Sequence, residues 1–293
     1  MKQGHVIVSF RSECLVTTST GEMLRCTTRR RTGRAVCGDS VDCSGLAGQH
    51  VIDTIHPRRN TLVRTDYRGR HKPLAANLDQ LLIVCAGEPS PDARLVDRYL
   101  VLAASMGLRP LLAMNKSDLD ATRLPEPLQE ASRQQHCQVL HVSASTGDGL
   151  DILTRYLAGN RTLLVGQSGV GKSSLINALV PDRQARTQAI SEASGQGRHT
   201  TTETTLYPLP SGGELVDSPG VRILRLGHLS RQEIESGFSE IARQAEDCEF
   251  RDCEHDDEPG CAVRPAVEQG LIHPERLKGF HELLRERHQA AGQ

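Results

Sequence analysis

The chain has 293 residues, of which 37% are hydrophobic, and a formal net charge of −1. This length allows two or three domains. No apolar run approaches the roughly 18–20 residues of a membrane-spanning helix, and the first residues, MKQGHVIVSF, lack the apolar core of a secretory signal. We therefore expect a cytoplasmic protein that has no membrane partner and is monomeric. Nine cysteines, an odd number, favour reduced thiols and a metal site over a disulfide framework.

The charge is distributed unevenly along the chain. Residues 1–75 contain 13 Lys and Arg against 6 Asp and Glu, whereas residues 231–293 contain 8 against 15. We therefore predict that the basic N-terminal part binds a polyanion and that the acidic C-terminal part does not.

The first 70 residues are predicted to form short strands separated by turn residues such as Gly21 and Gly33. Five or six such strands with no helical period indicate a small barrel, of which an OB-fold is the best candidate. We assign residues 1–72 to this domain and expect a linker at Gly69–Pro73. The expected strands are His5–Phe10, Glu13–Thr18, Met23–Thr28, Ala35–Cys43, His50–His56 and Thr61–Asp66.

An arginine cluster, Arg29–Arg31 with Arg34, lies on a predicted loop of this barrel. A solvated charged surface is the alternative to an RNA contact. Residues 1–75 have two aromatic residues, Phe10 and Tyr67, so a base-stacking platform is not expected. We predict recognition of the backbone and shape of structured RNA, with a strong dependence on salt.

From Leu78 onward, apolar strands alternate with helices. This alternation predicts a mostly parallel sheet with helices on both faces, in a domain of residues 73–228. The polar stretch 181–205 is expected to be a loop. The expected elements are the strands Leu81–Gly87, Leu111–Asn115, Gln138–Ser143, Thr162–Val165, Thr204–Pro208 and Glu214–Asp217, and the helices Asp92–Met106, Leu128–Gln135, Leu150–Leu157 and Lys172–Leu179.

A glycine-rich segment, Gly166–Ser173, fits the pattern G-x-x-x-x-G-K-[ST] between a strand and a helix. Glycines allow backbone N–H groups to turn toward phosphate oxygens, and the helix N-terminus adds partial positive charge. Lys172 is expected to bridge the β- and γ-phosphates as a catalytic residue, and the Ser173 hydroxyl to bind Mg²⁺. The predicted nucleotide-binding residues of this segment are Gly166, Gln167, Ser168, Gly169, Val170, Gly171, Lys172, Ser173 and Ser174.

The segment Asn115-Lys116-Ser117-Asp118 fits N-K-x-D at the end of a predicted strand. A carboxylate at Asp118 can accept hydrogen bonds from guanine N1 and its amino group, a donor pair that adenine lacks. Asn115 and Lys116 are assigned to the same base site. The triplet Ser143-Ala144-Ser145, just past the next strand, is expected to contact the guanine carbonyl through the backbone, with Ser143 and Ala144 as nucleotide-binding residues.

The segment Asp217-Ser218-Pro219-Gly220 fits D-x-x-G after another strand. Asp217 is expected to hold a Mg²⁺-bound water, and the Gly220 N–H to sense the γ-phosphate, which makes Gly220 a candidate catalytic residue. Thr200 and Thr201, on the preceding loop, are nucleotide-binding candidates, and Thr201 is a further candidate ligand of Mg²⁺.

The base motifs therefore precede the phosphate loop, and the γ-phosphate sensor comes last, which is the order of a circularly permuted GTPase domain. Compared with an unpermuted GTPase domain, this domain begins just before the strand Leu81–Gly87. The N- and C-terminal ends of the unpermuted domain are joined between Leu157 and Thr162. Such a join is feasible because the termini of these domains often lie close together.

A cysteine and histidine cluster stands in the last, otherwise helical domain, residues 229–293. Cys248, Cys253, His255 and Cys261 supply three thiolates and an imidazole, the closed tetrahedral shell of a structural zinc ion. Buried cysteines are the alternative, but the surrounding acidic residues argue against an apolar core there. The other six cysteines are expected to be small strand hydrophobes.

The sequence resembles the ribosome small-subunit-dependent GTPase A family, also called RsgA or YjeQ. The resemblance lies in the order of the motifs, the basic barrel before them and the cysteine cluster after them. The resemblance extends over nearly the whole chain, and includes Ala75–Asp79 and the loop ending Gly197–Thr201. It implies a cytoplasmic GTPase that converts GTP to GDP and phosphate late in small-subunit maturation, with that subunit and its rRNA as partners. The fold class is then α/β, with a permuted P-loop GTPase domain between an OB-fold barrel and a helical zinc-binding domain.

The position after the sensor glycine, which often carries a water-orienting glutamine, is Val221. We hypothesise that His199 approaches the attacking water when the subunit orders its loop; a role in packing or phosphate contact is the alternative. Two alternative functions remain open, a GTP-controlled RNA-binding module and a GTPase of large-subunit assembly.

Overall fold

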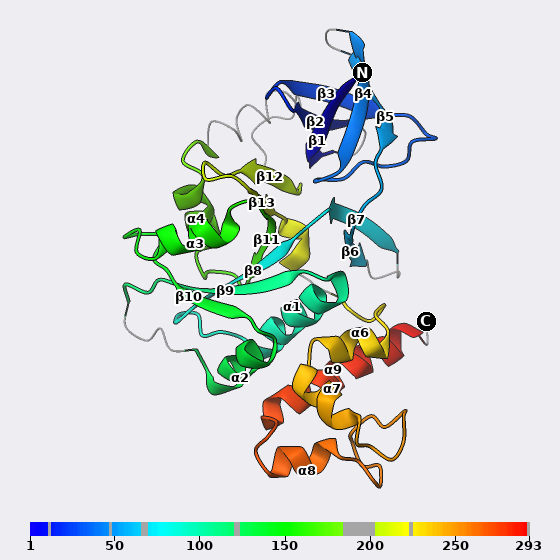
Figure 1. The fold of residues 1–293 in the computed structure, drawn as a ribbon, viewed down its shortest axis with the longest axis vertical. Coiled ribbons are helices and arrows are strands. Elements are labelled where there is room, and N and C mark those ends of the chain that lie inside the picture. The colour runs from blue at the N-terminus through cyan, green and yellow to red at the C-terminus, as the bar shows by residue number, and fades with distance from the viewer. Residues whose placement is uncertain are drawn as a thin grey trace.

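The computed structural model describes residues 1–10, 13–46, 49–65, 70–119, 124–183, 203–222 and 225–291. Along the chain it contains a strand barrel, an α/β sheet with helices on both faces, and a group of C-terminal helices (Figure 1). Among the described residues, no helix is both long and apolar enough to cross a membrane.

A closed five-stranded barrel forms the N-terminal part. The strand order is β1-β2-β3-β5-β4, and β4 pairs back onto β1. All pairs are antiparallel except β3 with β5, and a small apolar core that includes Val6, Val16 and Ile52 fills the interior. This confirms the OB-like barrel. Its strands are β1 Lys2–Ser9, β2 Glu13–Thr18, β3 Met23–Thr28, β4 Ser40–Leu46 and β5 Gln49–Ile55.

The expected strand Ala35–Cys43 begins five residues later than predicted, at Ser40. The fully buried carboxylate of Asp39 accepts a hydrogen bond from the Val36 N–H at 2.7 Å and forms an ion pair with Arg58, also at 2.7 Å. These bonds hold the segment before β4 in a turn, because a side chain that binds its own backbone competes with strand pairing.

The predicted linker at Gly69–Pro73 is wrong from His71 onward. Strand β7, His71–Ala76, pairs antiparallel with β6, Thr61–Thr65, as a separate hairpin. Pro73 suggested a break, but a two-stranded hairpin consists of edges, where a residue without an N–H is tolerated.

The central sheet has the order β10-β9-β8-β11-β13-β12 (Figure 1). The first five strands are parallel, and β12 pairs antiparallel with β13 and touches β1 of the barrel at Thr205. The strands are β8 Gln80–Ala86, β9 Arg109–Asn115, β10 Gln138–His141, β11 Arg161–Gly166, β12 Thr205–Pro208 and β13 Glu214–Asp217.

Two apolar cores lie on opposite faces of this sheet, as predicted for a doubly covered parallel sheet. Helices α1 and α2 contribute to one core, and α3 and α4 contribute to the other. Asp92 begins α1 by accepting hydrogen bonds from the backbone N–H groups of Arg94 and Leu95. The helices are α1 Ala93–Met106, α2 Glu126–Gln134, α3 Leu150–Leu157 and α4 Lys172–Leu179.

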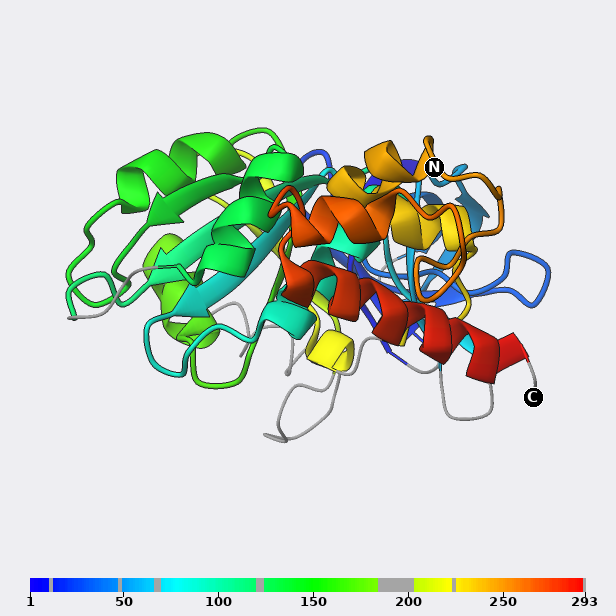
Figure 2. The ribbon, with the colours of Figure 1, turned by 90° about the horizontal axis from the view of Figure 1, so that it is seen from below.

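The C-terminal helices join the face of the sheet that α1 covers. Helices α6 and α9 both contact α1, and α9 is the long helix that runs across the molecule in Figure 2. Ser230 and Glu233 form a capping box at the start of α6. The helices are α6 Arg231–Ser236, α7 Ser239–Ala245, α8 Val263–Glu268 and α9 Pro274–Ala291.

A buried ionic triad fastens these helices to α1. Arg276 of α9, only 1% exposed, donates hydrogen bonds to Asp97 of α1 and, at 2.6 Å, to Glu240 of α7. Its guanidinium also lies 4.3 Å from the centre of the Phe238 ring and donates to the Gly237 carbonyl at 3.0 Å. Burial raises the pKa of Asp97 to about 6, although Arg276 opposes this shift.

Removing the guanidinium from this triad should strongly destabilise the protein. Arg276→Ala leaves two carboxylates buried without their cation, and we expect the free energy of unfolding to fall by about 3–5 kcal/mol. Urea denaturation measures this loss. The matched control is Arg94→Ala, which removes two partly exposed ion pairs between α1 and α9, with Glu275 and Glu282, and should cost about 1 kcal/mol or less. Equal losses in the two variants would contradict the prediction.

Candidate nucleotide site and metal centre

The predicted nucleotide motifs meet at one edge of the central sheet. The phosphate loop follows β11, the D-x-x-G segment begins at the end of β13, and the two base motifs follow β9 and β10. These strands are parallel and adjacent, with only β8 between β9 and β11, so their carboxyl ends lie together. Ligands of open α/β sheets bind at this edge.

The phosphate loop has backbone conformations that require glycine. At Gly166, with φ of +142°, a Cβ would lie 2.2 Å from the Val84 carbonyl oxygen of β8. At Gly171, with φ of +90°, a Cβ would lie 2.3 Å from Asn115 Nδ2. The loop thus fits tightly between neighbouring strand ends, and α4 begins directly at Lys172.

Lys172 and Ser173 lie where this loop would receive phosphate. The Lys172 ammonium donates hydrogen bonds to the carbonyl oxygens of Gly166, at 2.6 Å, and Gln167, at 2.5 Å, so it folds back over the loop. Ser173 is exposed on the first turn of α4. A cation and the N-terminus of a helix on one loop form an arrangement suited to an anion.

Asn115 connects the base motifs to the phosphate loop. Its side chain is 2% exposed; Nδ2 donates to the Val170 carbonyl at 2.9 Å, and Oδ1 accepts from the Ala144 N–H at 3.1 Å. The neighbouring Lys116 has φ of +62° and donates through Nζ to the Glu88 carbonyl at 2.7 Å. Asn115 therefore holds the two loops in register, a role that its place in the motif did not indicate.

Two serines orient the exposed carboxylate of Asp118. The Ser143 hydroxyl donates to Oδ1 at 2.5 Å and the Ser145 hydroxyl to Oδ2 at 3.3 Å. The bond from Ser143 lowers the pKa of Asp118, which favours the ionised, accepting form. Ser145 was expected only as part of a backbone contact to the base, and its hydroxyl bond to Asp118 was not predicted.

An amide in place of this carboxylate should change the base that is bound. In Asp118→Asn an N–H donor faces guanine's own donors, whereas xanthine offers a carbonyl oxygen at that position. We expect the preference for guanine over xanthine nucleotides to shift by about 10³-fold or more toward xanthine, because a mismatched polar pair is costly. Competition binding measures the shift. Asp148→Asn, in the same loop region, is the control and should leave the preference unchanged.

The D-x-x-G segment places Asp217 at the end of β13, beside Leu164 of β11. Ser173 and Asp217 provide oxygen ligands of the kind that Mg²⁺ prefers. Val221 is 4% exposed and belongs to the apolar core, so its side chain faces away from any attacking water. Gly220 lies in the short helix η1, Pro219–Arg222, whereas His199, Thr200 and Thr201 lie outside the described residues.

Arg183 is a residue of this site that sequence reasoning missed. It follows α4, and its guanidinium forms an ion pair with Asp217 at 3.2 Å. No motif contains it, and a charged residue in a polar stretch gives no local sign of its partner.

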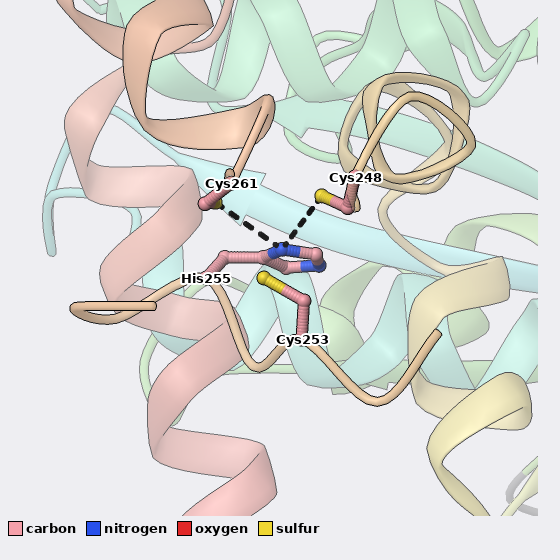
Figure 3. Close-up of side chains that lie close together, drawn as sticks. All are labelled: Cys248, Cys253, His255 and Cys261. Atoms are coloured by element: carbon pink, nitrogen blue, oxygen red, sulfur yellow. Dashed lines mark hydrogen bonds between the residues drawn. The ribbon is translucent and has the colours of Figure 1, made fainter. Parts of the chain in front are cut away.

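Cys248, Cys253, His255 and Cys261 converge in the C-terminal domain, as Figure 3 shows. Their ligand atoms lie within 4.8 Å of one another, and His255 Nδ1 is 3.7 Å from the sulfurs of both Cys248 and Cys261. Cys248 follows α7 and Cys261 precedes α8, so the site joins these two helices. This donor set and spacing fit a structural zinc ion.

Burial shifts the pKa values of two residues of the cluster. Burial, reinforced by the neighbouring thiols, raises the pKa of Cys253 to about 12, and burial lowers the pKa of His255 to about 4. The imidazole is therefore neutral and able to ligate, while a divalent ion would favour the thiolate forms. The other six cysteines are free and buried, as expected: Cys14, Cys26, Cys37, Cys43, Cys85 and Cys137.

Comparison with known proteins agrees with this geometry. The family model described as RsgA GTPase matches residues 55–227. The chain belongs to the RsgA GTPase family. A small ribosomal subunit biogenesis GTPase RsgA from Pseudomonas fluorescens is 47% identical over 268 residues, which cover 90% of this chain and 78% of that protein. The protein of that name from Haemophilus influenzae is 41% identical over 293 residues, covering 97% and 84%.

Two solved structures have the same overall fold as this RsgA GTPase. YjeQ from Thermotoga maritima aligns with a TM-score of 0.73 at 30% identity, over 98% of each chain. YloQ, described as a circularly permuted GTPase, aligns with the same TM-score at 26% identity, over 99% of this chain and 96% of its own. The chain is therefore a permuted P-loop GTP hydrolase, and GTP, GDP and Mg²⁺ are its cofactors, as its motifs predicted.

Proposed function

We propose that this GTPase acts in the maturation of the small ribosomal subunit and is stimulated by that subunit. The observation that carries the proposal is the 47% identity, over 90% of the chain, to a protein named as a small ribosomal subunit biogenesis GTPase. A second protein of that name aligns over 97% of this chain, so the relation is not limited to a nucleotide-binding core.

In this proposal each domain has a separate task. The N-terminal domain, assigned to residues 1–72 and containing the barrel, binds rRNA. The permuted domain of residues 73–228 binds and hydrolyses GTP, and the helices of residues 229–293 are held by zinc. The four arginines on the loop after β3 support the RNA contact because all are exposed: Arg29, Arg30, Arg31 and Arg34. An arginine cluster without aromatic neighbours suits phosphate and groove-shape contacts, whose strength falls as salt rises.

GTP is held at the edge of the sheet described above. Asp118 accepts from the base, the phosphate loop and Lys172 bind the phosphates, and Ser173 and Asp217 supply oxygens toward Mg²⁺ directly or through water. Since Val221 is buried, a water-orienting group must come from elsewhere in this chain or from its partner. We assign this role to His199, and subunit-stimulated turnover that stays at the wild-type rate in His199→Ala would rule it out.

This proposal includes a cytoplasmic location and a monomeric state, both compatible with binding to a partner as large as a ribosomal subunit. The zinc ion, held by three cysteines and one histidine, would have a structural task because four protein ligands leave no open position for a substrate.

Multiple-turnover hydrolysis of GTP and of ATP, with purified small and large subunits added separately, tests the proposal. We expect small subunits to raise GTP turnover by about 10²-fold, the lower range of what a positioned proton acceptor contributes. ATP turnover should stay at background. Stimulation by large subunits instead would favour large-subunit assembly. Single-turnover rates that are equal with and without subunits would favour a GTP-controlled binding module.

A further inference from the structure

Arg183 is held by four groups around the sensor end of the nucleotide site. Its guanidinium donates to Asp217 Oδ2 at 3.2 Å, to Asn177 Oδ1 at 2.9 Å and to the Ser173 carbonyl oxygen at 3.2 Å. It also lies 5.5 Å from the centre of the Tyr207 ring. The Arg183 side chain is only 19% exposed.

These contacts place a fixed positive charge where the nucleotide-bound protein needs a metal ion. The Ser173 hydroxyl and Asp217 are assigned to Mg²⁺. Arg183 contacts the Asp217 carboxylate and the backbone carbonyl oxygen of Ser173. A guanidinium on Asp217 partly neutralises the carboxylate and uses one of its oxygens, and a cation near a second cation repels it. Mg²⁺-bound water and Arg183 therefore compete for this carboxylate.

We propose that Arg183 is a positioning residue that holds Asp217 and competes with Mg²⁺ for it. The inference rests on the proposed role of Asp217 in the GTP site. Arg183 thereby sets the concentration of Mg²⁺ at which nucleotide becomes tightly bound. It also links the sensor at the end of β13 to Asn177 of α4.

The charge, and not the hydrogen bonds alone, is the active property in this proposal. Lysine at position 183 keeps the positive charge and can reach a carboxylate, whereas glutamine keeps hydrogen-bonding groups without charge. A direct role of Arg183 on the γ-phosphate makes the opposite prediction, because its loss would then weaken nucleotide binding at every Mg²⁺ concentration.

Binding of a fluorescent N-methylanthraniloyl GDP, measured over a series of buffered free Mg²⁺ concentrations, distinguishes these cases. We expect Arg183→Ala and Arg183→Gln to lower the half-saturating Mg²⁺ concentration about fivefold, the effect of one partly exposed ion pair. Arg183→Lys should behave as wild type. The control is Arg155→Ala, which removes an exposed ion pair with Asp151 on α3 of the same domain and should leave the half-saturating Mg²⁺ concentration unchanged.

Several outcomes would overturn the proposal. A half-saturating Mg²⁺ concentration that is unchanged or higher in Arg183→Ala contradicts competition, and wild-type behaviour of Arg183→Gln contradicts a role for the charge. If wild-type nucleotide binding shows no dependence on Mg²⁺, the assignment of Ser173 and Asp217 fails as well. A dependence on Mg²⁺ that is present but insensitive to Arg183 removes this inference alone. Circular dichroism melting of each variant verifies that it is folded.

Discussion

Lys172→Ala is expected to lower kcat/KM for GTP by about 10³-fold, the upper range for losing one charged group that stabilises a transition state. The Lys172 ammonium bends back over the phosphate loop and donates hydrogen bonds to the carbonyl oxygens of Gly166 and Gln167. With phosphate bound it would exchange these carbonyls for the β- and γ-oxygens, where negative charge develops during transfer. Alanine leaves the backbone N–H groups of the loop in place but removes this charge.

Steady-state hydrolysis and nucleotide binding together measure this effect. Lys278→Ala, which removes an exposed lysine paired with Glu275 on α9, is the matched control and should hydrolyse GTP at the wild-type rate. Because Lys172 is only partly buried, the variant should keep its fold. A Lys172→Ala protein with turnover within a few-fold of wild type would mean that the phosphates bind elsewhere.

Cys253→Ser should remove the metal from the C-terminal domain and unfold the cluster. Cys253 is 2% exposed and is one of four ligand atoms within 4.8 Å of one another. Binding of zinc to sites of this kind contributes about 10–16 kcal/mol to small zinc domains, so the loss of one thiolate removes much of what orders the chain between α7 and α8. The surrounding acidic residues offer no apolar core as a replacement.

Metal analysis of purified protein after dialysis tests the zinc site directly. Wild type should retain one zinc ion per chain and Cys253→Ser much less, with a lower free energy of unfolding. The matched control is Cys137→Ala, which changes another buried cysteine, at the end of the turn before β10, and should retain the metal. A full equivalent of zinc in Cys253→Ser would show that these four residues are not the ligands.

Those parts of the protein that depend on short-range chemistry were predictable from sequence. The phosphate loop, the N-K-x-D and D-x-x-G segments and the cluster of three cysteines and one histidine each occupy a few neighbouring positions, because one loop must present several groups to one ligand. Apolar strands and turn residues likewise predicted the barrel and the parallel sheet. The order of the motifs then implied the permutation, since their places in the sheet follow from the strands that carry them.

Tertiary structure alone determined the partners of isolated charged and polar side chains. Arg276 meets Asp97 across 179 positions of the chain, and Arg183 meets Asp217 across 34. Likewise β7 is a strand because β6 lies beside it, although Pro73 suggests a break. Local patterns report backbone preference and burial, whereas the pairing of two distant groups depends on how whole elements pack. The nucleotide motifs and the Cys/His cluster could therefore be read from the chain, but the arginine that anchors the C-terminal helices and the one that pairs with Asp217 could not.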